Sequence, residues 1–111
     1  MSAKANGLGA VLTELYATIE ARRGADPKSS YTASLLAAGP ARCAKKFGEE
    51  AIETVIAAAE GDKTALTEEA ADTLYHLLVL LAAKGVTPDD VAGALARRKG
   101  VSGHDEKASR S

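Results

Sequence analysis

The sequence predicts an all-α protein, a helical bundle of about five helices. Two observations support this prediction. Alanine, leucine, glutamate and lysine dominate the composition, and apolar residues recur at helical spacing with almost no strand-like alternation. The 111 residues suit one compact domain and leave no room for two. We therefore expect a helical domain over residues 1–100 and a basic, flexible C-terminal tail over residues 101–111.

Glycine, proline and capping residues divide the chain into its expected helices. Pro40 and Pro88 suit first helical turns, and Gly61 and Gly85 suit helix ends. Thr87 offers a cap for the last helix. The expected helices cover about residues 8–23, a short segment between 29 and 39, and then 40–60, 64–84 and 88–99.

The fourth expected helix is apolar on every face. Between Leu74 and Ala83, leucine, valine and tyrosine side chains occur all the way around it. A helix of this kind must be covered on every side, which a chain of five helices hardly achieves alone. We expect the bundle to be completed by dimerisation through this helix. The alternative is that the short second helix and the tail cover it.

Composition and charge limit the classes of partner. The net charge of −1 gives no general attraction to nucleic acid or to an anionic membrane, and the few aromatic residues offer no base-stacking platform. No apolar run is long enough to span a bilayer, and the N-terminus has no secretion signal. Cys43 is the only cysteine, which suits a reducing compartment. We expect a cytoplasmic protein that binds neither nucleic acid nor membrane.

Two pairs of acidic residues carry the functional prediction. Glu50 and Glu53 lie three residues apart on the third helix, and Glu69 and Asp72 do so on the fourth. Residues at this spacing share a helix face. A tight connection makes the helices antiparallel, and a rise of about 1.5 Å per residue puts the pairs level to within roughly 3 Å. Four converging carboxylates would form an all-oxygen site for Mg²⁺.

The ordinary explanation of each pair is a solvated helix surface. Lys46 to Glu50 and Lys45 to Glu49 have the spacing of common i,i+4 ion pairs. Helical geometry alone therefore leaves the metal site and the acidic surface both open.

Several flanking residues are candidates for contact with a phosphorylated substrate. His76 shares the face of Asp72, where it is either a substrate ligand or a core histidine with its hydrogen bonds satisfied. Lys46 projects near Glu50 and suits neutralisation of a phosphate, and Lys45 is a weaker candidate. The segment from residue 97 to the end is basic, and Arg and Lys bind phosphates well. Its candidate substrate contacts are Arg98, Lys107 and Arg110.

The sequence resembles a known family. The run KKFGEEAIE over residues 45–53, followed by EEAADTLYHLLVLL over residues 68–81, is similar to the phosphoribosyl-ATP pyrophosphohydrolases of histidine biosynthesis. SYTA at residues 30–33 and SGHDEKASR at residues 102–110 resemble them too, so the similarity covers residues 8–110. The ExxE…ExxD pattern alone marks the wider MazG-like superfamily of all-α nucleotide pyrophosphohydrolases. The longer runs are more specific.

The resemblance implies hydrolysis of the α–β phosphoanhydride of N1-(5-phosphoribosyl)-ATP, which gives the AMP analogue and pyrophosphate. It also implies Mg²⁺ as cofactor, a cytoplasmic homodimer, and metal ligation by Glu50, Glu53, Glu69 and Asp72. Glu49 is a candidate general base, although it lies about 100° around the helix from Glu50. We expect a separate protein to carry out the cyclohydrolase step that follows.

Two other functions are compatible with the pattern. The first is a housecleaning pyrophosphohydrolase of the same superfamily that acts on non-standard NTPs or dNTPs, against which the SYTA segment and the tail argue. The second is a non-catalytic helical dimerisation module whose acidic pairs are only surface.

Overall fold

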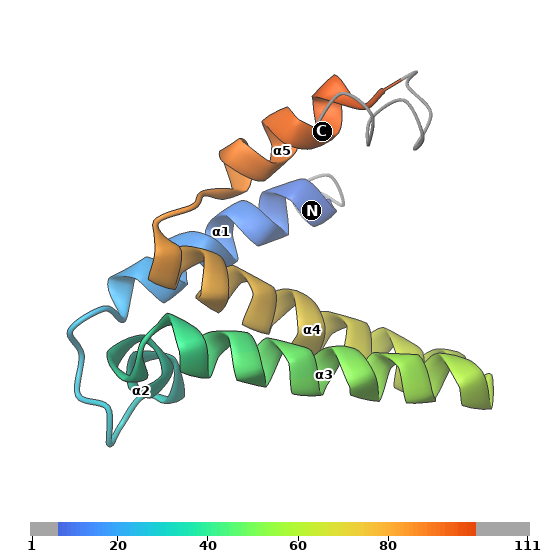
Figure 1. The fold of residues 1–111 in the computed structure, drawn as a ribbon, viewed down its shortest axis with the longest axis horizontal. Coiled ribbons are helices and arrows are strands. Elements are labelled where there is room, and N and C mark those ends of the chain that lie inside the picture. Colours follow the sequence, from blue (N-terminus) through green and yellow to red (C-terminus); the bar gives the residue numbers. More distant parts are fainter. Residues whose placement is uncertain (1–6, 100–111) are drawn as a thin grey trace.

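The computed structural model describes residues 7–99, and these form five helices without a strand. The all-α prediction is confirmed. Figure 1 shows the helices in chain order. They are α1 (Leu8–Ala21), α2 (Tyr31–Ala38), α3 (Pro40–Glu60), α4 (Lys63–Lys84) and α5 (Pro88–Arg97).

Local capping explains where the helices begin and end. The Asp62 carboxylate accepts hydrogen bonds from the backbone N–H groups of Thr64 and Ala65, and so starts α4. Gly61 ends α3 in the left-handed conformation with φ 77°. At α5, Thr87 and Asp90 form a reciprocal capping box. These boundaries agree with the sequence prediction.

Two predicted helix ends are two residues too long. α1 ends at Ala21, where Arg22 and Arg23 already form a turn leading to Gly24 at φ 82°. α5 ends at Arg97. Terminal turns of helices fray, so sequence patterns locate helix ends only to within one or two residues.

α3 and α4 form an antiparallel hairpin that is the longest part of the molecule (Figure 1). α1 packs against α4, α5 contacts α1, and α2 closes the end of the hairpin where α3 begins. The core lies where these helices meet around the C-terminal half of α4, and its buried residues are Ile19, Leu35, Cys43, Leu78, Val79 and Ala82. The other half of the hairpin, toward Gly61, extends beyond this core and exposes both polar and apolar side chains.

One side of α4 is only partly covered by the rest of the described chain. Leu78 and Val79 are buried, but Leu74 and Leu77 are half-buried and line an apolar groove of about 580 Å³ between α1, α4 and α5. Leu95 of α5 lines the same groove and is 59% exposed. The short second helix therefore does not cover this side. The predicted covering by the tail lies outside the described residues.

None of the helices within residues 7–99 combines the length and the apolar character needed to cross a membrane. The division into a domain over residues 1–100 and a tail stays a prediction, because residues 100–111 lie outside the described part.

Candidate active site

Three carboxylates come together between α3 and α4. Glu50 belongs to α3, and Glu69 and Asp72 belong to α4. One carboxylate oxygen from each lies within 4.8 Å of the other two. Glu50 and Glu69 are half-buried and Asp72 is exposed. We call these three residues the acidic triplet.

Helix geometry explains why the triplet forms. The three-residue spacing of Glu69 and Asp72 puts both side chains on one face of α4. The short turn at Gly61 and Asp62 then brings α3 back alongside α4 with Glu50 at nearly the same level. The predicted convergence of the two helix faces therefore occurs.

Glu53, the fourth predicted ligand, lies outside the acidic triplet. Its side chain is exposed on α3, about one helical turn beyond Glu50 in the direction of Gly61. It is still near enough for its negative charge to act on Glu69. The structure therefore brings three of the four predicted ligands within reach of one ion and leaves the fourth at the edge.

The surroundings of the triplet disfavour the ionised form of Glu69. The pKa of Glu69 is raised above its ordinary value, first by burial of the carboxyl group and then by the charges of Asp72, Glu53 and Glu50. Lys46 forms its ion pair with Glu49 and acts on Glu50 of the triplet only as a more distant charge.

The donor set fits Mg²⁺. Mg²⁺ binds oxygen ligands at about 2.1 Å, so opposite ligands of its octahedron lie about 4.2 Å apart. Neighbouring ligands lie only about 3.0 Å apart. The triplet oxygens lie within 4.8 Å of one another, so they would draw closer together around a bound ion. Because all three donors are carboxylate oxygens, hard divalent cations are favoured over metals that prefer nitrogen or sulfur.

Lys46 pairs with Glu49 and not with Glu50. The Lys46 ammonium lies 3.2 Å from the Glu49 carboxylate, and 24% of the Lys46 side chain is exposed. This hydrogen bond is the main cause that raises the pKa of Lys46, followed by the nearby Tyr31 hydroxyl. The predicted i,i+4 pair of Lys46 with Glu50 is therefore wrong, because an i,i+3 arrangement takes its place. The predicted pair of Lys45 with Glu49 is likewise absent from the described residues, and Lys45 is exposed.

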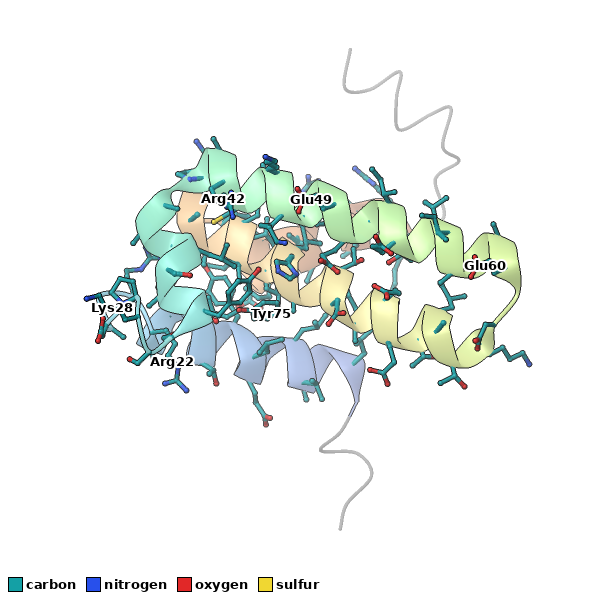
Figure 2. All side chains as sticks on the ribbon, turned by 90° about the horizontal axis from the view of Figure 1, so that it is seen from below. Arg22, Lys28, Arg42, Glu49, Glu60 and Tyr75 are labelled. Carbon is teal, nitrogen blue, oxygen red and sulfur yellow. The ribbon has the colours of Figure 1, made fainter. Side chains whose placement is uncertain are left out.

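His76 has the environment of a core histidine with both ring nitrogens satisfied. It is 7% exposed, and its Nδ1 lies 2.9 Å from the backbone carbonyl oxygen of Asp72. Because a carbonyl only accepts, Nδ1 carries the proton and the Tyr31 hydroxyl donates to Nε2 over 3.1 Å. The ring also packs edge-on against Tyr75, with centroids 4.8 Å apart. Figure 2 shows Tyr75 on α4 near α2.

The other candidate contacts are exposed or lie outside the described residues. Glu49 is exposed on α3, and Figure 2 shows it well before Glu60 on the same helix. Arg98 is exposed in the turn after α5. Lys107 and Arg110 lie outside the described residues.

Sequence reasoning missed two residues beside the triplet, Thr54 and Thr73. Their hydroxyl groups lie 2.7 Å apart between α3 and α4. The signal was present, because each threonine follows a triplet glutamate, Glu50 or Glu69, by four residues and so shares its face. Threonine is common on helix surfaces, so this spacing alone drew no attention.

Several known proteins similar to this chain share one description. A phosphoribosyl-ATP pyrophosphatase from Dinoroseobacter shibae is 62% identical over 90% of this chain and 98% of its own length. Proteins with the same name from Ruegeria pomeroyi and Paracoccus denitrificans are 61% and 62% identical, over 90% and 89% of this chain and 95% and 92% of their own lengths. Residues 12–99 match the phosphoribosyl-ATP pyrophosphohydrolase family. The chain therefore belongs to the phosphoribosyl-ATP pyrophosphohydrolase family.

Proposed function

We propose that the protein hydrolyses phosphoribosyl-ATP to phosphoribosyl-AMP and pyrophosphate, the second step of L-histidine biosynthesis. Membership of the family and the names of the similar proteins support this substrate. The acidic triplet is the observation that carries the proposal, because it supplies a cation site of the kind that phosphoanhydride hydrolysis needs.

Glu50, Glu69 and Asp72 hold Mg²⁺ in this proposal, and Glu53 completes the set by turning its exposed side chain inward. Bound there, Mg²⁺ offsets phosphate charge and lowers the pKa of a coordinated water. The four carboxylates would fix the position of that ion between α3 and α4. Glu49 is positioned one residue from Glu50 and serves as general base after it leaves Lys46.

Basic residues around the triplet bind the phosphates. Lys46 lies on the same helix as Glu50, and its ion pair to Glu49 opens when a more highly charged anion approaches. Lys45, Arg98, Lys107 and Arg110 contribute further charge around the substrate. His76 acts mainly by position, since its bond to the Asp72 carbonyl fixes the turn of α4 that carries this ligand.

The uncovered side of α4 supports a homodimer. Leu74 and Leu77 line an open apolar groove with Leu95, and a second copy of the chain would bury it. We place the protein in the cytoplasm, where the unpaired thiol of Cys43 stays reduced. A separate cyclohydrolase then acts on the product.

A pyrophosphate-release assay tests the proposed function. We expect release from phosphoribosyl-ATP that depends on Mg²⁺, and turnover well above that of any dNTP in a panel. A preference for a dNTP would instead support the housecleaning activity.

Paired variants test the site. Changing a residue that only orients a metal ligand typically costs about 10- to 100-fold in affinity or activity. Because Glu53 and Glu69 are proposed as ligands themselves, we expect the double variant Glu53→Gln with Glu69→Gln to lose at least about 100-fold in turnover. Its helical content should stay unchanged. Glu60→Gln is the matched control, because Glu60 lies at the far end of α3 and outside the triplet (Figure 2). Hydrolysis by the double variant at the parent's rate would show that the site assignment is wrong, and absence of hydrolysis in the parent as well would support the non-catalytic module.

A further inference from the structure

Two threonine hydroxyls connect the two helices that carry the acidic triplet. Thr54 Oγ1 lies 3.0 Å from the carbonyl oxygen of Glu69 on the opposite helix, and Thr73 Oγ1 lies 3.0 Å from the carbonyl oxygen of Glu50. The hydroxyls are 2.7 Å apart, and Thr54 Oγ1 is also 3.1 Å from the Glu50 carbonyl oxygen. We call Thr54 and Thr73 the threonine pair.

The threonine pair links the helices in more than one arrangement of its protons. Each hydroxyl has one proton, so two protons serve four contacts. In one arrangement Thr73 donates to Thr54, which donates to the Glu69 carbonyl. In another, Thr54 donates to Thr73, which donates to the Glu50 carbonyl. Both arrangements form a chain of hydrogen bonds from one helix to the other.

The carbonyls that the threonine pair contacts belong to two members of the triplet. Glu50 and Glu69 provide ligands from different helices, so the separation of their backbones sets how well both carboxylates reach one cation. Within residues 7–99, the chain contains other threonines, but their hydroxyl hydrogen bonds do not join α3 to α4. Thr18 and Thr67 bond only to the carbonyl four residues earlier on their own helices.

Loss of the two hydroxyls would leave the helices intact. In an α-helix each carbonyl already accepts a hydrogen bond from the N–H group four residues later, so the threonines occupy only the second lone pair. Valine has nearly the same shape as threonine and fills the same half-buried space. What valine removes is the polar link that resists sliding and separation of α3 and α4.

We propose that Thr54 and Thr73 are positioning residues, which hold the backbones of Glu50 and Glu69 at the separation that a divalent cation needs. This inference rests on the proposed function, because it concerns the same metal centre. In this proposal, two neutral side chains that do not touch the cation contribute to the affinity of the protein for it.

Mn²⁺ binding to the full chain, measured without substrate by the loss of the free-ion electron paramagnetic resonance signal, tests the proposal. Each single variant, Thr54→Val or Thr73→Val, retains one hydrogen bond between the helices, so we expect only about a threefold loss of affinity. The double valine variant retains neither, and we expect a loss of about tenfold or more, in the range of residues that orient metal ligands. The loss in the double variant should exceed the product of the two single losses.

Two controls separate positioning from a general loss of stability. Thr54→Ser with Thr73→Ser keeps both hydroxyls and should bind Mn²⁺ within about twofold of the parent. Thr67→Val removes a hydroxyl from α4 that bonds only within its own helix, and it should leave the affinity unchanged. The Tm of each metal-free variant, followed by circular dichroism, reports any purely structural effect.

Each result decides a different point. Parent-like Mn²⁺ affinity in the double valine variant, whatever its Tm, overturns the inference while leaving the metal centre in place. If that variant does not fold, parent-like affinity in both single variants overturns it equally. A parent protein whose Mn²⁺ binding is absent, or survives Glu50→Gln, disproves the metal centre itself and this inference with it.

Discussion

Glu69 has an environment that disfavours its own charge in the metal-free protein. The residue is half-buried, and its pKa is raised by desolvation and by the charges of four other carboxylates. Such an arrangement reduces stability unless a cation offsets the charge. Proteins tolerate a loss of this kind where function requires it, so the raised pKa agrees with a binding site better than with an ordinary acidic surface.

Removal of the Glu69 charge should stabilise the metal-free protein. The pKa of Glu69 is higher in the folded state than in the unfolded state, so the folded protein holds the Glu69 proton more tightly. The free energy of unfolding therefore falls as the pH rises through the folded-state pKa. We expect Glu69→Gln to have a higher Tm than the parent near neutral pH without metal. The gain should disappear as the pH is lowered to the ordinary glutamate pKa, about 4.3. Thermal unfolding followed across this pH range checks the prediction.

Glu14→Gln is the control for this effect, because Glu14 is exposed on α1 and outside the triplet. Addition of Mg²⁺ should raise the Tm of the parent and not that of Glu69→Gln. A Glu69→Gln variant less stable than the parent at neutral pH without metal would contradict this account.

The sequence predicted which residues share the acidic face, but not the side-chain conformations. Backbone spacing alone places Glu50, Glu69 and Asp72 together. Side-chain rotamers on a solvated helix differ little in energy. They decide whether Glu53 turns inward. They also decide whether Lys46 pairs with Glu49 or with Glu50. At the candidate site, these are the points at which the sequence prediction and the structure differ.

At the scale of secondary structure, the α3–α4 hairpin positions the site, and its turn was predictable. Gly61 and Asp62 are the residue types that end one helix and begin the next, so the level of the two acidic faces follows from counting. The threonine pair was not predictable in the same way. Its hydrogen bonds depend on how closely α3 and α4 approach, which the packing of the whole hairpin determines.

Two glycine-to-alanine substitutions should change stability in opposite directions. Gly61 has φ 77°, where alanine costs about 1 kcal/mol or more, although nothing lies within 4 Å of the added methyl group. We expect Gly61→Ala to lower the Tm by roughly 5 °C. Gly93 lies inside α5 with open space around it, so Gly93→Ala should add up to about 1 kcal/mol. Thermal denaturation of both variants beside the parent checks the pair.

Equal changes in Tm for the two alanine substitutions would contradict the prediction, because they would show that the left-handed conformation of Gly61 does not affect the stability of the hairpin. The comparison is well matched, because both positions are open to solvent and only their backbone conformations differ.

At the scale of the whole molecule, the described residues leave an apolar groove of about 580 Å³ uncovered. The sequence indicated it through a helix that is apolar on every face, and the structure places the open side between α1 and α5. A second apolar surface, formed by Ile52, Val55 and Ile56, is exposed on α3. Sequence patterning identifies such faces, but not which of them meets a second copy.

Two charge substitutions distinguish these surfaces. Leu95 lines the groove and is 59% exposed, so Leu95→Glu costs a single chain little. If copies pair across the groove, this substitution buries a charge at the interface and should shift the protein to monomer. Val55→Lys on α3 should leave a dimer of that kind intact. Light scattering after size-exclusion chromatography gives the mass of each variant.

A parent protein that is monomeric at micromolar concentration would contradict the proposed dimer. A dimer that Val55→Lys separates and Leu95→Glu does not would place the interface on α3 instead.

The central claim is that Glu50, Glu69 and Asp72 together bind one divalent cation. Its most direct test is a crystal structure of the protein soaked with Mn²⁺, which shares the preference of Mg²⁺ for carboxylate oxygens and has an anomalous signal. We predict an anomalous peak between α3 and α4, within coordination distance of an oxygen from each of the three. A protein that is active in the same Mn²⁺ solution, yet binds the ion elsewhere or shows these side chains turned apart, would contradict the claim.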